Sequence, residues 1–137
     1  MTVAEEFSLT PENCPTNGAF MPYSRLNNDF NNGALMYGFY INDQIIGFAQ
    51  IVDKHNGIYE LEKLAVSPEY RHRGYGSKLI EFVVQKVREL KGFKIVIGII
   101  EQNQHVKHWY QSNGFMHLGT KTLSHLPFIV GFMELIL

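Results

Sequence analysis

The sequence predicts an α+β fold: a mixed, mostly antiparallel central sheet with one parallel crossover and flanking helices. Three observations support this class. Short apolar runs separated by turn residues fill the middle of the chain, a longer segment with helical periodicity follows, and a run that is apolar on both faces comes directly after it. The length of 137 residues suits one domain, so we expect residues 1–137 to fold as a single unit.

The first strands are expected after a polar N-terminal third. Residues 1–34 are rich in Asn, Pro, Gly and Ser, and only the segment 22–30 suggests a helix. Turn residues then separate three apolar runs, which predicts an antiparallel meander. The expected strands are 35–41, 44–52 and 58–66, with turns at Asn42-Asp43, Asn56-Gly57 and Ser67-Pro68.

The longest predicted helix follows this meander. Apolar residues recur at helical spacing from Ser77 to Leu90, and Gly92 is the expected C-cap. Residues 93–100 are apolar on both faces, which is typical of a central strand that a β-helix-β crossover places parallel to its neighbour. The remaining expected elements are a helix over 104–112 and a closing hairpin of strands 115–123 and 128–137.

Composition narrows the class of protein. Hydrophobic residues make up 45% of the chain and the formal net charge is -1, which excludes a disordered chain and any general attraction to nucleic acid or membranes. Cys14 is the single cysteine, so no intramolecular disulfide is expected. The first residues lack the pattern of a signal peptide, and the apolar run 95–100 is too short to span a membrane. We therefore expect a cytoplasmic protein with neither nucleic acid nor a membrane as its partner.

The segment Arg71-His72-Arg73-Gly74-Tyr75-Gly76, between a predicted strand and the long helix, has the character of a phosphate site. Its two glycines allow close backbone approach, and the helix N-terminus adds unpaired N–H donors. Two known glycine loops do not fit: Leu79 stands where a dinucleotide fingerprint needs a third glycine, and the segment lacks the spacing of a P-loop. The simpler alternative is a glycine-rich turn with solvated basic residues.

Two motifs carry a resemblance to a known family. The segment 61–80 resembles the acetyl-CoA signature of the GNAT superfamily of N-acetyltransferases, Gln/Arg-x-x-Gly-x-Gly/Ala between a strand and a helix. Downstream, Asn103 is followed seven residues later by Tyr110 and then by Gly114-Phe115, which is similar to the second element of that family. The resemblance covers about residues 35–137 and implies a GNAT-like three-layer fold, with acetyl-CoA as cosubstrate.

The resemblance also implies how acetyl-CoA would be held. Backbone groups of Leu64 and Val66 would bond the pantetheine, and N–H groups from His72 to Ser77 would receive the pyrophosphate. Asn103 matches the family position that contacts the pantetheine. The full set of expected cofactor-binding residues is Leu64, Ala65, Val66, Arg71, His72, Arg73, Gly74, Tyr75, Gly76, Ser77, Asn103 and Tyr110.

Three residues are candidates for catalysis. Ile58, Glu60, Glu62 and Leu64 are expected to share one strand face, and the resemblance favours Glu60 over Glu62 as the general base. The alternative is that both carboxylates are solvated or paired with Lys63 or an arginine. Tyr110 occupies the family position of the acid that protonates the leaving thiolate, unless it only packs beside other aromatic residues.

The expected function is direct acetyl transfer from acetyl-CoA to a primary amine of a small acceptor. A non-catalytic CoA-binding regulatory module and an acetyltransferase of protein or peptide amines are the alternatives. His105 and His108 share a helical face without a further ligand at metal spacing, so we expect no metal. The acceptor stays open, and the apolar last strand could pair across a homodimer.

Overall fold

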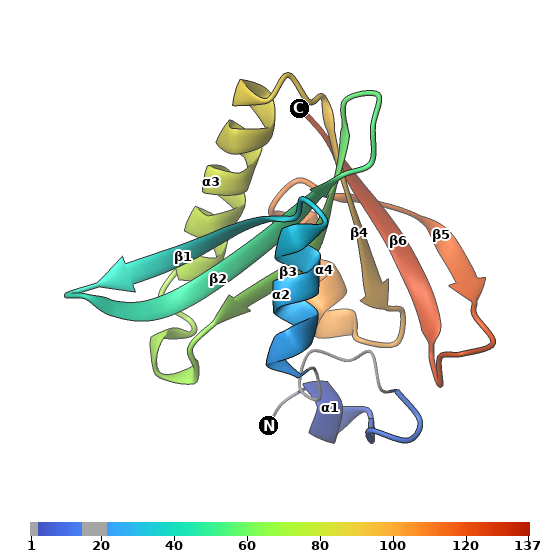
Figure 1. Cartoon of the computed structure of the whole chain (residues 1–137). Helices are drawn as coiled ribbons and strands as arrows, with labels where there is room; N and C mark the ends of the chain where they lie inside the picture. Colours follow the sequence, from blue (N-terminus) through green and yellow to red (C-terminus); the bar gives the residue numbers. More distant parts are fainter. Residues whose placement is uncertain (1–2, 15–21) are drawn as a thin grey trace.

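The computed structural model describes residues 3–14 and 22–137 and has the expected α+β architecture (Figure 1). One six-stranded sheet has the order β1-β2-β3-β4-β6-β5, in which only β3 and β4 run parallel. The strands are β1 Leu35–Ile41, β2 Gln44–Asp53, β3 Ile58–Val66, β4 Lys94–Ile100, β5 Met116–Thr122 and β6 Ile129–Ile136. The helices are α1 Val3–Glu6, α2 Tyr23–Asn31, α3 Tyr75–Glu89 and α4 Gln104–Ser112, with a 3-10 turn at Pro68–Tyr70.

The arrangement of helices on the two faces of the sheet follows from the positions of the apolar side chains. The buried residues of α3 (Leu79, Ile80, Val83 and Val87) pack with strand residues in the main core, and α4 contacts the same core through Val106, Trp109 and Tyr110. Helix α2 lies on the opposite face of the sheet (Figure 1). The expected three layers are therefore confirmed, and no helix in the described part of the chain is long and apolar enough to span a membrane.

The first helical segments differ from this pattern. Helix α1, which the sequence did not predict, carries Ala4 into a small second core with Leu9 and Cys14, against Ile100 and the loop before β6. Helix α2 has no buried residue. Its contacts with the sheet include the polar contacts of Asp29, described below.

A β-bulge in β3 overturns one expectation. Leu61 pairs with Ile51 and Lys63 pairs with Gln50, so Glu62 is an extra residue in the ladder. The bulge shifts the alternation of faces, and Leu64 packs against the same core as Leu61. The expectation that Ile58, Glu60, Glu62 and Leu64 share one face is therefore wrong for Leu64.

The end of α3 also differs from the prediction. The helix begins at Tyr75, ends at Leu90 as its C-cap, and Lys91 takes the left-handed conformation with φ 65°. The N–H of Gly92 donates to the carbonyl of Val87, and that of Lys91 to Arg88, which is a Schellman motif. Gly92 is thus not the C-cap. It is needed because a Cβ at this position would overlap Val87 and Tyr59.

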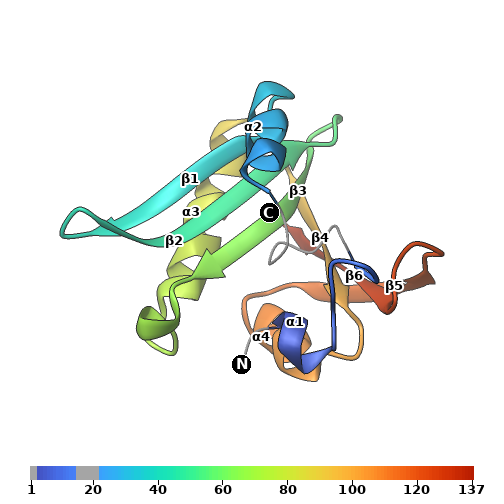
Figure 2. The same cartoon turned by 60° about the horizontal axis from the view of Figure 1, so that its bottom comes forward.

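Strands β3 and β4 pair only at their beginnings. Ile58, Tyr59 and Glu60 are in register with Lys94, Ile95 and Val96, and no pairing continues beyond Glu60. Strand β4 instead pairs along its whole length with β6. The carboxyl-terminal parts of β3 and β4 consequently diverge (Figure 2).

Burial in β4 is less even than the sequence predicted. Ile95, Ile97 and Ile99 are buried on the core face, whereas on the other face Val96 and Ile100 are half-buried and Gly98 is exposed. The expectation that both faces of this strand are covered therefore holds for one face only.

Candidate active site

The loop between β3 and α3 presents backbone donors at a helix N-terminus. His72 and Gly74 have left-handed backbone conformations, with φ of 61° and 82°. Gly74 is the N-cap of α3 and supplies no side-chain hydrogen bond to the first turn. The first N–H groups of this 15-residue helix therefore have no side-chain cap among the described residues and can receive an anion.

Basic side chains surround this loop without being neutralised. Among the ion pairs of the described residues, none includes Arg71, Arg73 or Lys78. Arg73 lies 5.5 Å from the ring centroid of Tyr70, and Nε of Arg71 donates to the carbonyl of Val66 at 3.1 Å. The loop is thereby tied to the end of β3, with its positive charge open to an anionic ligand.

Gly76 has a steric role in the same loop. A Cβ at this position would lie 2.8 Å from Cζ2 of Trp109, so α4 packs directly on the first turn of α3. An open pocket of about 350 Å³ lies beside the loop and is lined in part by Val66, Ser67 and Arg71. The rest of the pocket lining comes from residues 45–48 of β2 and from Ala65 and Pro68, so the pocket is largely apolar.

Asn103 sits between the divergent strand β4 and helix α4. It is buried, and its Oδ1 accepts a hydrogen bond from the N–H of Val106 at 3.1 Å as the N-cap of α4. The amide Nδ2 donates to no described residue, so this nitrogen is the part of the side chain that can bind a ligand. Its structural role as a cap was not expected from the sequence.

Tyr110 is enclosed by aromatic side chains. Its ring makes edge contacts with Trp109 and Phe115, at centroid distances of 4.9 Å and 5.3 Å. Burial raises the pKa of Tyr110 to about 12, and the hydroxyl donates to no group among the described residues. The phenol is therefore protonated at every physiological pH and keeps a free donor.

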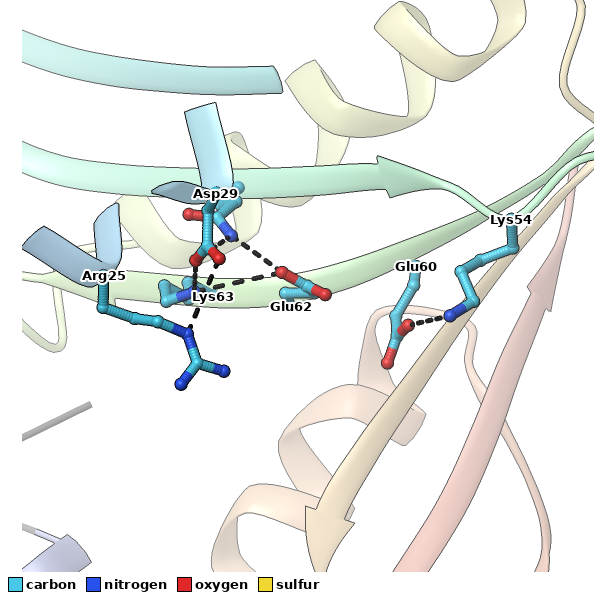
Figure 3. Close-up of polar contacts among 7 residues, drawn as sticks. Arg25, Asp29, Lys54, Glu60, Glu62 and Lys63 are labelled. Atoms are coloured by element: carbon cyan, nitrogen blue, oxygen red, sulfur yellow. Dashed lines mark hydrogen bonds and ion pairs between the residues drawn. The ribbon is translucent and has the colours of Figure 1, made fainter. Parts of the chain in front are cut away.

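The two candidate carboxylates have different surroundings (Figure 3). Glu60, the last β3 residue paired with β4, forms an ion pair with Lys54 at 3.2 Å. Glu62 lies in the bulge, where β3 has already separated from β4. Its Oε2 accepts a hydrogen bond from Nε2 of Gln50 at 2.7 Å, and its Oε1 contacts no described polar group.

Asp29 of α2 joins Glu62 in a polar cluster that the sequence did not predict. Lys63 Nζ lies 3.1 Å from Asp29 Oδ2 and 3.9 Å from Glu62 Oε2, and Gln50 Nε2 donates to Asp29 Oδ2 at 3.2 Å. Partial desolvation favours the neutral acid, but the hydrogen bonds from Gln50 and Lys63 outweigh it and hold the pKa of Asp29 below its usual value. This cluster fixes α2 on the sheet (Figure 3).

Only part of this cluster left a signal in the sequence. Gln50 is the one polar residue in the run 45–52, and such an interruption of an apolar strand could have drawn attention to it. Asp29 left none, because it lies 34 positions before Lys63 in the chain.

A second polar cluster lies just beyond β4. Glu101 accepts from Lys107 of α4, and its Oε2 is hydrogen-bonded to Nε2 of His117 of β5 at 2.8 Å. These two hydrogen bonds, first that from Lys107, lower the pKa of Glu101 below its usual value. His105 and His108 are exposed, and no group of three potential metal ligands occurs in residues 3–14 and 22–137.

Comparison with known proteins identifies the family of the chain. Residues 4–115 match the model of the acetyltransferase (GNAT) family. A spermine/spermidine N(1)-acetyltransferase of Bacillus subtilis is 30% identical over 90 residues, covering 60% of this chain and 59% of that protein. An N-acetyltransferase of Lactobacillus delbrueckii is 29% identical over 91 residues, covering 60% of this chain and 51% of its own length. The chain thus spans about half the length of the curated relatives it matches.

Solved structures share the fold at lower identity. A Bacillus subtilis acetyltransferase in complex with CoA superposes with a TM-score of 0.73 at 17% identity, over 100% of this chain and 94% of that one. A GNAT family acetyltransferase from Elizabethkingia anophelis with acetyl-CoA bound gives a TM-score of 0.72 at 19% identity, over 89% and 94% of the two chains. The family match, together with the donor loop and the divergent strands, shows that the chain belongs to the GNAT acetyltransferase family.

Proposed function

We propose that the chain is an acetyl-CoA-dependent N-acetyltransferase that moves the acetyl group directly to a primary amine of a small acceptor. The observation that carries this proposal is the combination of the uncapped N-terminus of α3 with the divergence of β3 from β4 beyond Glu60. The N-terminus of α3 suits a diphosphate, and the separation of the strands leaves backbone groups of β3 without a partner in β4. Both features lie at the carboxyl end of β3.

The residues present fit acetyl-CoA, which supplies the acetyl group as a thioester. N–H groups from His72 to Ser77 would hold the diphosphate, and Arg71 and Arg73 would balance its charge. Backbone groups of Leu64 and Val66, at the free edge of β3, would bond the pantetheine arm together with Nδ2 of Asn103. A backbone N–H directed at the developing oxyanion can lower the barrier by about 3 kcal/mol.

Glu62 is the carboxylate best placed to act as the base. An amine with a pKa near 10.4 needs about 4–5 kcal/mol to reach its free-base form at pH 7, and a nearby carboxylate offsets part of this cost. Glu62 stands at the divergence of the strands with Oε1 uncommitted, whereas Glu60 lies at the paired end and is occupied by Lys54. We therefore assign the base to Glu62 rather than to Glu60, which the family resemblance favours.

Tyr110 would stabilise the departing thiolate as a hydrogen-bond donor. With its pKa raised to about 12, full transfer of its proton to an ordinary thiolate of pKa about 8.5 would cost about 5 kcal/mol. Donation of a hydrogen bond needs no such transfer, and it is strengthened by the low-polarity surroundings of Trp109 and Phe115.

The charges near the cluster favour an acceptor of low charge. Glu60, Glu62 and Asp29 already have Lys54 and Lys63 as cationic neighbours. A polycationic acceptor would have to displace these lysines, whereas a monoamine would need only the free oxygen of Glu62. Although one relative is named for spermine and spermidine, we propose a small monoamine for this chain.

Release of free thiol from acetyl-CoA in the presence of a panel of amines tests the proposed function. We expect turnover with at least one monoamine, and the acetylated product identified by mass spectrometry. Tight acetyl-CoA binding without turnover on any amine would instead favour a CoA-binding regulatory module. Turnover confined to peptides would favour a protein or peptide acetyltransferase.

A further inference from the structure

Gln50 is the most unusual side chain of the sheet. It is fully buried at 0% exposure in β2, between the buried residues Ala49 and Ile51. Its Nε2 donates to two carboxylates, but its Oε1 is buried with no hydrogen-bond partner among the described residues. An unpaired buried amide oxygen is destabilising, and an apolar side chain of the same size would avoid it. The part of Gln50 that makes favourable contacts is therefore its donor group, Nε2.

The orientation of the amide follows from its neighbours. Both groups that face Nε2 are carboxylate oxygens, Asp29 Oδ2 and Glu62 Oε2. Reversal of the amide would place Oε1 against two acceptors, which is unfavourable. Gln50 is consequently fixed as a donor, and its shorter bond, 2.7 Å, goes to Glu62.

We propose that Gln50 is a positioning residue for the base Glu62: it binds one carboxylate oxygen and leaves the other directed to the acceptor amine. This inference rests on the proposed function. Glu62 needs such support because the bulge removes its ladder partner, and its side chain is 33% exposed. Without the bond from β2, the carboxylate could rotate toward Lys63, its nearest cation.

Among the described residues, Gln50 supplies the hydrogen bond to the Glu62 carboxylate at 2.7 Å, whereas Lys63 lies further away, at 3.9 Å. The other charged groups facing this carboxylate are Lys63 on β3 and Asp29 on α2, the latter with Arg25 at 3.7 Å. Glu60, nearer the beginning of β3, forms a separate ion pair with Lys54.

The test uses Gln50→Met, which keeps the side-chain volume and removes the donors. We expect kcat/KM to fall at least about fivefold, with KM for acetyl-CoA unchanged and only a modest fall in melting temperature, because Asp29 keeps its bond from Lys63. The loss should appear in kcat rather than in KM for acetyl-CoA, as a positioning role for the base requires. Gln85→Met is the matched control, because exposed Gln85 also donates to a glutamate, Glu89, and this variant should leave kcat/KM unchanged.

A double-mutant cycle separates positioning from a merely structural role. If Gln50 acts through Glu62, Gln50→Met should cost little in a Glu62→Gln background, so that the double variant is about as active as Glu62→Gln alone. Fully additive losses, or an unchanged kcat/KM in an active Gln50→Met enzyme, would overturn the inference while leaving the proposed function intact. If Gln50→Met does not fold, the same cycle with Gln50→Asn, whose shorter amide withdraws the donor from Glu62, decides, and additive losses there overturn the inference. An inactive wild type would remove the proposed function itself, and this inference with it.

Discussion

Single residues in this site have properties that their neighbours impose. Tyr110 illustrates this, because a phenol is ordinarily a weak acid, and burial between Trp109 and Phe115 weakens it further. The position of Tyr110 in the motif could be predicted from the sequence, but its raised pKa could not, since that depends on the packing of α4. The consequence is a change of expected role, from proton donor to hydrogen-bond donor.

Tyr110→Phe should lower kcat at least about tenfold while leaving acetyl-CoA affinity unchanged, because only the hydroxyl is removed. Since the pKa of Tyr110 is raised to about 12, its ionisation should cause no falling limb in the wild-type pH–rate profile up to about pH 10. Thiol release measured across that range checks both points. Equal kcat in the two proteins would remove Tyr110 from the mechanism.

At the scale of elements, the sequence predicted well where helices and strands lie, but it did not predict local irregularities such as bulges. The helix at 104–112 matches α4, and every predicted strand is present to within about one residue. The bulge at Glu62 left no pattern in the sequence, because a bulged strand differs from a regular alternating strand by only one unpaired residue. This small irregularity decides which side chains of β3 face the core and which carboxylate stands at the divergence of the strands.

The end of α3 gives a test at this scale. Gly92→Ala should destabilise the fold by about 1–3 kcal/mol, because the added methyl group would overlap Val87 and Tyr59 within the core. Thermal unfolding measures the effect. Gly119→Ala is the control, because no atom lies within 4 Å of the added Cβ, and it should be nearly neutral. Equal melting temperatures for the two variants would contradict the close packing described at Gly92.

For the whole molecule, the layers follow from hydrophobic patterning, whereas the attachment of α2 depends on polar contacts remote in sequence. Apolar periodicity predicted α3 and the strands beneath it, and these form the main core. Helix α2 is fixed through Asp29 to Gln50 and Lys63, a contact that no local pattern indicates. The polar cluster of Asp29, Gln50 and Lys63 therefore connects α2 to the sheet, a connection that the main apolar core does not make.

The polar clusters make stability depend on pH in a defined direction. Because the pKa of Glu101 is lowered in the folded state, its contribution is complete above the unfolded pKa of about 4.5 and is lost as the pH falls below that value. Glu101→Gln should cost about 1–3 kcal/mol at pH 7, and the difference between the two proteins should shrink as the pH falls below about 4.5. Urea unfolding at a series of pH values checks this. A constant difference across the range would contradict it.

The most direct measurement is calorimetric titration of acetyl-CoA and of acetyl-pantetheine, which lacks the diphosphate, into the wild type and into Gly76→Val. If the N-terminus of α3, with Arg71 and Arg73 before it, holds the diphosphate as proposed, we expect acetyl-CoA to bind the wild type at least about tenfold more tightly than acetyl-pantetheine. Gly76→Val, which forces Trp109 away from the loop, should remove most of that difference. No heat with acetyl-CoA, or equal affinities of the wild type for both compounds, would contradict the assignment of this loop.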